Sequence, residues 1–316
     1  MATVLNDMIV PEVFNPYLIE ETTKKSRFIN SGIATSDSSV VLAEGGKTIN
    51  VPFFKDIDED DEVLEDGGVG LTVNKIETAK SVAVVHARGT AYGASDLAKA
   101  FSGTDPMGAI ASKLGEVWAR KMQKLALASL DGVFKLDAMA DSVLDQSSAV
   151  LTAEMMADAS FLLGDNYDKI QCVAMHSAVL AKLKKLELVD WVQPSDLSLG
   201  FYTYMEKRVI VDDSIAASSG VYPIYFFGNG AFSYNENAAM AKVETEREAK
   251  TGFDNIYSRR FFTMHPRGLQ WLGASVAGET PTNAELALKA NWALAAERKN
   301  VAIGLLKARV AAAPST

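Results

Sequence analysis

The chain has 316 residues, 48% of them hydrophobic, so it can bury a large core as one domain or two closely packed ones. Its net charge of −9 argues against a nucleic-acid-binding surface as its main function, and a single cysteine, Cys172, excludes an intramolecular disulfide framework. The most apolar run, 221–232, contains a proline and two glycines and is shorter than the ~20 apolar residues that a bilayer requires. We therefore expect neither a membrane span nor, in residues 1–14, a secretion signal.

Residues 1–39 are predicted to form an N-terminal arm. Asn15 and Pro16 favour the start of a short helix, which Ser31 and Gly32 end. Acidic residues come early in this helix and basic ones late, as the helix dipole favours. No strong core pattern precedes residue 40, so the arm is not expected to be a domain.

Residues 40–80 are predicted to form an extended β-hairpin loop. The segment 47–54 alternates with period two, and its Pro52 favours an edge strand. A second alternating run, 71–76, leads into 82–85. The intervening acidic residues account for all but one unit of the net charge, and no basic residue separates them: Asp56, Asp58, Glu59, Asp60, Asp61, Glu62, Glu65 and Asp66. The sequence therefore predicts a solvated, acidic tip.

Residues 105–132 predict one long amphipathic helix. Asp105 can cap it, and Pro106 suits its first position. Apolar residues recur at steps of three and four: Met107, Ile110, Ala111, Leu114, Val117, Trp118, Met122 and Leu125. The basic residues lie largely off this stripe: Lys113, Arg120, Lys121 and Lys124. About 26 helical residues would span roughly 39 Å, so this helix is expected to run the length of its domain.

Residues 150–235 predict an α/β lobe. Helices are expected at 152–163 and from Ser177 onward, and strands at 170–175, 208–211, 222–227 and 231–234. Gly228-Asn229-Gly230 is typical of the turn of a hairpin between the last two strands.

Strands are predicted again at 242–245, 256–264 and 269–272. Thr282 and Glu285 form the pattern of a capping box, which predicts a C-terminal helix over 282–299. A terminal strand is expected after residue 301.

No motif predicts catalysis, a cofactor or a metal. Gly46-Lys47-Thr48 lacks the earlier glycine and the following helix of a phosphate-binding loop, and Asp56–Asp60 lacks the glycine and glutamate of a calcium loop. His86, His176 and His265 lie about ninety residues apart, without metal-ligand spacing. Gly273–Ala277 lacks the last glycine of a nucleophile elbow. We therefore expect no enzyme and no catalytic, cofactor or metal residues.

The order of these elements resembles the Hong Kong 97-like α+β fold of tailed-bacteriophage major capsid proteins. The resemblance rests on the opening MATVLNDMIVPEVFNPYLIEETTKKSRFINSG, on GGKTINVPFF and on DPMGAIASKLGEVWARKMQKLALASLDGVF. RVIVDD, FGNGAF, VETERE, RRFFTMHPRGLQW and TNAELALKANW continue it in the same order. It covers nearly the whole chain.

The resemblance implies an arm at 1–39, an extended loop at 40–80, a peripheral domain at 81–149 and 236–316 with a spine helix at 105–132, and an axial domain at 150–235. It implies a subunit that forms pentamers and hexamers, closing into an icosahedral shell around double-stranded phage DNA without sequence-specific binding. Implied partners are other copies, a separate scaffolding protein and a portal protein. Assembly would take place in the bacterial host cytoplasm, and the product would be the virion capsid.

Two alternatives remain open at this level. An encapsulin-like compartment shell would share the fold and enclose a protein cargo. A soluble α/β enzyme would use the 150–235 lobe and would have a pocket with converging polar groups.

Overall fold

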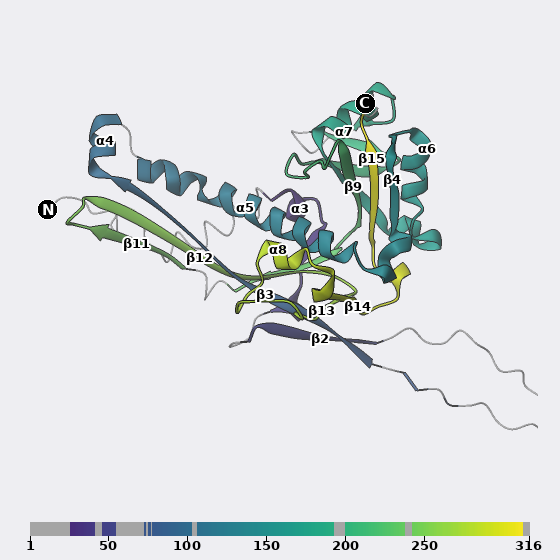
Figure 1. Cartoon of the computed structure of the whole chain (residues 1–316), viewed down its shortest axis with the longest axis horizontal. Coiled ribbons are helices and arrows are strands. Elements are labelled where there is room, and N and C mark those ends of the chain that lie inside the picture. Colours follow the sequence, from purple (N-terminus) through teal and green to yellow (C-terminus); the bar gives the residue numbers. More distant parts are fainter. Residues whose placement is uncertain are drawn as a thin grey trace, which may run out of the picture.

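A computed structural model describes residues 26–41, 46–54, 73, 75–76, 78–102, 106–192, 200–237 and 242–311. One long helix, α5 (Pro106–Val133), runs beside an elongated sheet and ends at a second, compact lobe (Figure 1). The predicted helix 105–132 is therefore confirmed, although its expected cap, Asp105, lies outside the described residues. The apolar stripe is the buried face, and Lys113, Arg120, Lys121 and Lys124 are exposed.

The first sheet has the strand order β1-β10-β12-β3-β2, with β11 paired to β12. Its strands are β1 (Ala34–Ser36), β2 (Thr48–Phe54), β3 (Thr78–Ser95), β10 (Phe232–Glu236), β11 (Lys242–Glu248) and β12 (Phe253–Pro266). The antiparallel pairing of β3 with β12 runs from Ser95 opposite Phe253 to Val85 opposite Thr263. The short helices α3 (Arg27–Asn30) and α4 (Asp96–Ser102) precede β1 and follow β3.

The base of the predicted hairpin is present. Strand β2 pairs antiparallel with β3, from Thr48 opposite Val84 to Phe54 opposite Thr78. The described residues Val73, Lys75 and Ile76 lie outside any strand, so the second strand begins later than the alternating run 71–76 predicts. The acidic residues 56–66 lie outside the described part of the chain.

The compact lobe contains the second sheet, of order β4-β15-β9-β5-β8-β7-β6. Its strands are β4 (Val143–Val150), β5 (Ile170–Met175), β6 (Asp190–Val192), β7 (Phe201–Tyr204), β8 (Lys207–Val211), β9 (Val221–Gly228) and β15 (Ile303–Arg309). Helices α6 (Ala153–Ser160) and α7 (Ser177–Lys185) contribute Met156, Val179 and Leu183 to the lobe's core. The two helices and the strands predicted at 170–175, 208–211 and 222–227 are therefore confirmed in this lobe.

The boundaries predicted for the lobe, 150–235, need correction at both ends. Strand β15 pairs with β4 and β9, so the segments 143–150 and 303–309 belong to this sheet and not to the elements around α5. Strands β9 and β10 do not form the hairpin that Gly228-Asn229-Gly230 predicts, because β10 pairs with β1 and β12 in the first sheet. Pairing partners far apart in the chain leave no local sequence signal, which explains both errors.

The predicted C-terminal helix 282–299 is wrong. The capping box at Thr282 is present, but α8 spans only Asn283–Leu286. Strand β14 (Trp292–Leu294) then pairs with β13 (Leu269–Trp271), and the indole Nε1 of Trp292 donates to the Leu286 carbonyl at 2.7 Å. Tertiary pairing of Trp292 thus overrides the helical pattern.

Short 3₁₀ helices occur at Ser38–Val40, Asp137–Ser142, Gly164–Lys169, Lys289–Asn291 and Arg298–Asn300.

A buried polar network fixes α5 on the first sheet. The indole Nε1 of Trp118 donates to the Ser258 hydroxyl at 2.9 Å, and the Arg260 guanidinium lies 5.4 Å from the Trp118 ring centre. Arg260 pairs with Glu236, and their side chains are only 1% and 4% exposed. The Tyr234 hydroxyl donates to the same carboxylate at 2.7 Å. Helix α5 and strands β10 and β12 therefore share one polar arrangement within an apolar core.

We predict that Glu236→Gln lowers the free energy of unfolding by about 3–5 kcal/mol, because it removes the negative charge that pairs with the buried Arg260 guanidinium. Urea unfolding followed by tryptophan fluorescence measures this. Glu246→Gln is the matched control, since Glu246 accepts from the Tyr257 hydroxyl at 2.8 Å on the exposed part of the sheet and should leave the midpoint nearly unchanged. Equal, small effects of the two substitutions would contradict the role of the buried pair.

Candidate functional site

The histidines and the cysteine, whose side chains could serve in catalysis or metal binding, lie apart in the structure. His86 and His265 are buried in strands β3 and β12, whereas His176 caps α7 by accepting from the Ala178 amide at 3.0 Å. The helix expected from Ser177 onward therefore begins there, with His176 as its N-cap. Cys172 is a buried strand residue, and burial raises the pKa of its thiol. Within the described ranges no group of three or more His, Cys, Asp or Glu residues could hold a metal ion.

The segments that partly match a phosphate-binding loop and a nucleophile elbow also have ordinary structural roles. Lys47 pairs with Glu279, and Thr48 begins strand β2, so no helix follows this segment. Gly273 follows strand β13 in a loop, with a positive φ of 63°. None of the helices in the described part of the chain is both long and apolar enough to span a bilayer.

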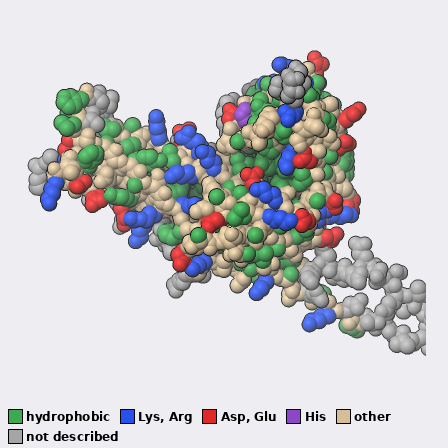
Figure 2. All heavy atoms as spheres, in the orientation of Figure 1, with side chains coloured by type: hydrophobic (Ala, Val, Ile, Leu, Met, Phe, Trp, Pro, Cys, Tyr) green, Lys and Arg blue, Asp and Glu red, His purple; other side chains and the backbone are tan. Residues whose placement is uncertain are grey.

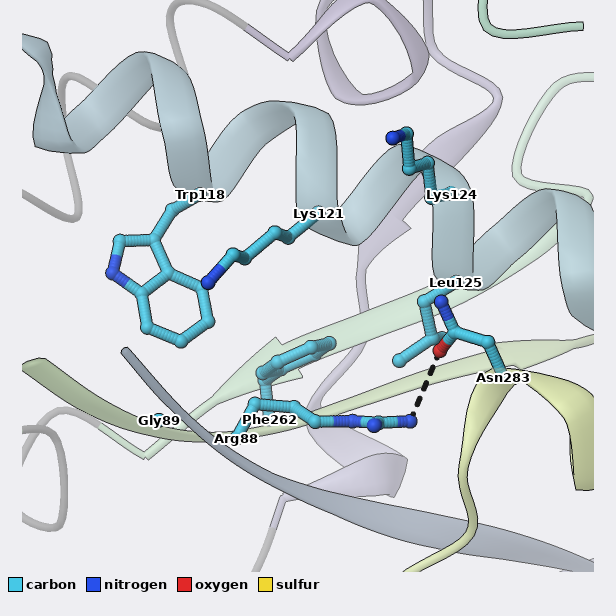
Figure 3. Close-up of a pocket in the computed structure, with 8 residues that line it drawn as sticks. All are labelled: Arg88, Gly89, Trp118, Lys121, Lys124, Leu125, Phe262 and Asn283. Carbon is cyan, nitrogen blue, oxygen red and sulfur yellow. Dashed lines mark hydrogen bonds between the residues drawn. The ribbon is translucent and has the colours of Figure 1, made fainter. Parts of the chain in front are cut away.

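A hollow of about 240 Å³ lies between α5 and the first sheet, midway along the helix (Figure 3). Trp118 and Leu125 of α5 and Phe262 of β12 contribute apolar walls, and each is at most 2% exposed. Leu125 and Phe262 belong to the largest hydrophobic cluster among the described residues. Because these walls are part of the packed core, a small rearrangement of surface side chains would not remove the hollow.

Three cationic side chains surround this hollow, which we name the cationic hollow: Arg88, Lys121 and Lys124. Figure 3 shows the two lysines projecting from α5 and Arg88 extending from β3 toward Asn283. The Lys121 ammonium lies 5.2 Å from the Trp118 ring centre. Among the described residues, no carboxylate lines the hollow and neither lysine forms an ion pair. Figure 2 shows basic side chains gathered on this face of the elongated part.

Arg88 is the most constrained cation of the hollow. Its Nη2 donates to the Pro281 carbonyl at 2.6 Å and to Asn283 Oδ1 at 3.1 Å, whereas its Nε is buried without a hydrogen-bond partner. Burial lowers the pKa of this guanidinium, and the Glu285 carboxylate opposes that effect. Glu285 is itself engaged, because the amides of Thr282 and Ala277 donate to it and hold its pKa below the ordinary value.

Sequence reasoning found part of this site. It named Lys121 and Lys124, but it grouped them with Lys113 and Arg120, which do not line the hollow. It missed Arg88, since the predicted strand stopped at residue 85, and it missed Asn283 as a neighbour of the helix. Extending the predicted strand beyond residue 85 would have included Arg88, because β3 runs to Ser95.

Comparison with solved structures identifies the class of fold. The capsid of Ralstonia phage GP4 matches with a TM-score of 0.60 at 9% identity, covering 93% of each chain. The capsid of cyanophage Pam1 matches with a TM-score of 0.56 at 13% identity, over 93% and 94% of the two chains. The SrpI encapsulin of Synechococcus elongatus PCC 7942 gives 0.51 at 9% identity, over 90% and 87%. The fold is therefore the mixed α/β, Hong Kong 97-like fold of shell-forming proteins.

Sequence comparison narrows this class. A model of the Gp13-like family, described as "Major capsid protein 13-like", matches residues 12–305. The major capsid protein of Bacillus phage SPP1 is 41% identical over 322 aligned positions, covering 98% of this chain and 99% of that protein. The chain belongs to this family: it is a major capsid protein of a tailed phage, a structural component of the virion capsid.

The two buried histidines predict how stability depends on pH. Burial, assisted by Arg88, lowers the pKa of His86 to about 3, and burial lowers that of His265 to about 4. Both rings therefore stay neutral in the folded protein, while in the unfolded chain they gain protons below about pH 6.5. Stability is full above pH 6.5 and falls as the pH is lowered, by up to about 1.4 kcal/mol per pH unit for each histidine.

Urea unfolding at pH 7, 6 and 5 measures this slope. His86→Phe removes one titrating ring from beside Phe262, whose ring centre lies 5.6 Å away, and should reduce the loss between pH 6 and 5 by about half. A stability that does not change between pH 7 and 5 would contradict the assignment of both rings as neutral and buried.

Proposed function

We propose that this capsid protein assembles through pentamers and hexamers into an icosahedral shell that encloses double-stranded phage DNA. The fold shared with the phage GP4 and Pam1 capsids and the family relationship support this proposal. A ring of identical subunits needs two different, complementary surfaces on each subunit. The paired strands β2 and β3 lead the chain outward at Phe54 and Thr78, and a projecting loop laid on the next subunit would supply one such surface.

The parts of the subunit take roles within this shell. Residues 1–39 act as the N-terminal arm, and 40–80 as the extended loop that reaches a neighbour. The peripheral domain consists of α5, as its spine helix, with the first sheet. The axial domain, which would surround the axis of each pentamer and hexamer, is the lobe of the second sheet, with 143–150 and 303–309 included.

Other partners follow from this role. A separate scaffolding protein and a portal protein would join assembly in the bacterial host cytoplasm. The net charge of −9 suits a container that holds DNA without sequence-specific contacts, because a shell that gripped phosphates would hinder release. The encapsulin likeness extends to the fold alone at 9% identity, and the family relationship favours a phage shell over a cargo compartment or an α/β enzyme.

Electron microscopy of the purified protein, alone and co-expressed with a scaffolding protein, tests the proposal. We expect capsomer rings or closed shells in at least one condition. A protein that stays a stable monomer or dimer under both conditions would overturn the assignment.

Deletion of residues 56–70 separates folding from assembly. The deletion begins beyond the last β2–β3 pair, Phe54 with Thr78, and so leaves the core of both sheets intact. We expect unchanged circular dichroism and a thermal midpoint close to that of the wild type, with far fewer closed shells in micrographs. Normal shells from the deletion variant would show that the loop is dispensable.

A further inference from the structure

We propose that a second pocket, at the base of the β2–β3 pair, binds one small, neutral, amphiphilic molecule with an apolar body and a single hydroxyl or amide head. We name it the loop-base pocket. Its volume is about 260 Å³, and its lining comes from segments far apart in the sequence, among them the turn 37–40, strands β2 and β3, the turn after β12 and the segment 296–300. The inference concerns the single subunit and does not depend on the proposed shell assembly.

Apolar side chains form a large part of the wall of the loop-base pocket. Val51 and Phe53 point to the same face of β2, because side chains alternate along a strand, and both are only half-buried. Val40 and Ala296 line the pocket from two other segments, and Val40 is fully part of the core at 2% exposure. Transfer of apolar surface from water to such walls is favourable in proportion to the area buried. The walls therefore select a ligand with an apolar body.

The two charged side chains of the lining neutralise each other. Arg267 Nη2 donates to Asp37 Oδ2 at 3.0 Å, and Arg267 Nε donates to the Ser233 hydroxyl at 2.8 Å. Burial tends to raise the pKa of Asp37, but hydrogen bonds from Ser39 and Ser233 and the Arg267 charge hold it at about 2, so the carboxylate is ionised at neutral pH. No other described residue of the lining is charged at neutral pH, since His265 is neutral. An ionic ligand would find no spare counter-ion here, and its burial would be costly.

Hydroxyl groups and the guanidinium provide for one neutral polar head. The Ser39 hydroxyl donates to Asp37 and the Ser81 hydroxyl to the Leu269 carbonyl, so both oxygens keep the capacity to accept a hydrogen bond. Arg267 Nη1 forms no hydrogen bond with the described residues, so this nitrogen can still donate. An alcohol or a primary amide both donates and accepts without carrying a charge, and therefore matches these groups.

The size and the polarity of the pocket favour a free molecule over a segment of chain. At about 260 Å³ the pocket is smaller than typical sites for drug-sized ligands, so its ligand is a fragment of roughly two fused rings. Asp37, Ser39, Ser233 and Arg267 are joined by mutual hydrogen bonds into a single polar cluster. A peptide carries a polar amide at every residue, and those lying on the apolar wall would lose their hydrogen bonds to water without replacement.

Three naphthalene derivatives with the same body and different heads test the ligand class: neutral naphthylmethanol, anionic naphthoate and cationic naphthylmethylammonium. Each is titrated into the full-length subunit, and methyl NMR resonances of labelled valines report binding near Val40 and Val51. We expect saturable binding of the alcohol with a dissociation constant of about 0.1–1 mM, and binding of either ion at least about tenfold weaker. An alcohol that leaves these resonances unchanged, or an ion that binds as tightly, would overturn the proposal.

Two neighbouring phenylalanines of β2 give a matched pair of variants. Phe53 lines the pocket, whereas Phe54 points to the other face of the strand and is 74% exposed. Phe53→Ala should weaken the binding of naphthylmethanol about tenfold or more, and Phe54→Ala should leave it unchanged. Ala296→Leu, which narrows the pocket and removes no side chain from it, should also weaken binding, and circular dichroism shows which variants are folded. Folded variants that all bind equally well would overturn the proposal.

The internal charge balance predicts a reciprocal change of head preference. Asp37→Asn leaves the Arg267 charge without its partner, so naphthoate should then bind more tightly than naphthylmethanol. Arg267→Gln leaves the Asp37 carboxylate without its partner and should favour naphthylmethylammonium instead. A preference for the alcohol that stays unchanged in both folded variants would show that the charged pair does not set the choice of head, and would contradict the proposal.

A peptide of residues 1–14 tests the competing occupant, because this stretch of the same chain is rich in apolar side chains. We expect that the peptide does not displace naphthylmethanol from the wild-type subunit. A peptide that displaces the alcohol, and that loses its own binding in Phe53→Ala but not in Phe54→Ala, would assign the loop-base pocket to a segment of the protein. That result would overturn the proposal.

Discussion

The structure depends on the packing of one long helix against one long sheet. An apolar stripe on α5 brings the helix to strands β3 and β12, and the buried pair of Arg260 and Glu236 fixes its position through Trp118. A buried ion pair adds little net stability over an apolar replacement, but it tolerates only one arrangement of its partners. That single arrangement also sets the distance between Arg88 on the sheet and the lysines on the helix. The cationic hollow is therefore a consequence of how the core is packed.

Sequence patterns predicted those elements whose formation depends on residues close together in the chain. The periodicity of α5, the capping box at Thr282 and the alternation of β2 each arise from neighbours in sequence, and the structure confirms all three. The errors concern long-range pairing. Strand β15 crosses into the second sheet, and Trp292 leaves a helical pattern to pair with Trp271. No periodicity in the sequence reports a partner more than a hundred residues away, as β4 is for β15.

The candidate site also combines features that the local sequence predicts with features that only folding brings together. Charge patterning identified Lys121 and Lys124 as off-stripe cations and residues 56–66 as an acidic segment, because both are readable from spacing alone. Arg88 comes from a strand that meets the helix only in the folded chain, so its unpartnered Nε could not be predicted. The buried histidines illustrate the point again: nothing in the sequence marks His86 and His265 as buried, yet their burial leads us to expect a fold that loses stability in acid.

The central claim is that the loop at 40–80 of one subunit reaches a neighbouring subunit of the shell. Zero-length carbodiimide cross-linking tests it most directly, in shells assembled from an equal mixture of ¹⁴N- and ¹⁵N-labelled protein. The account predicts amide links between carboxylates of residues 56–66 of one copy and lysines of another, with mixed isotope pairs present at the level expected for different chains. Links from this segment that are confined to a single isotope label would contradict it.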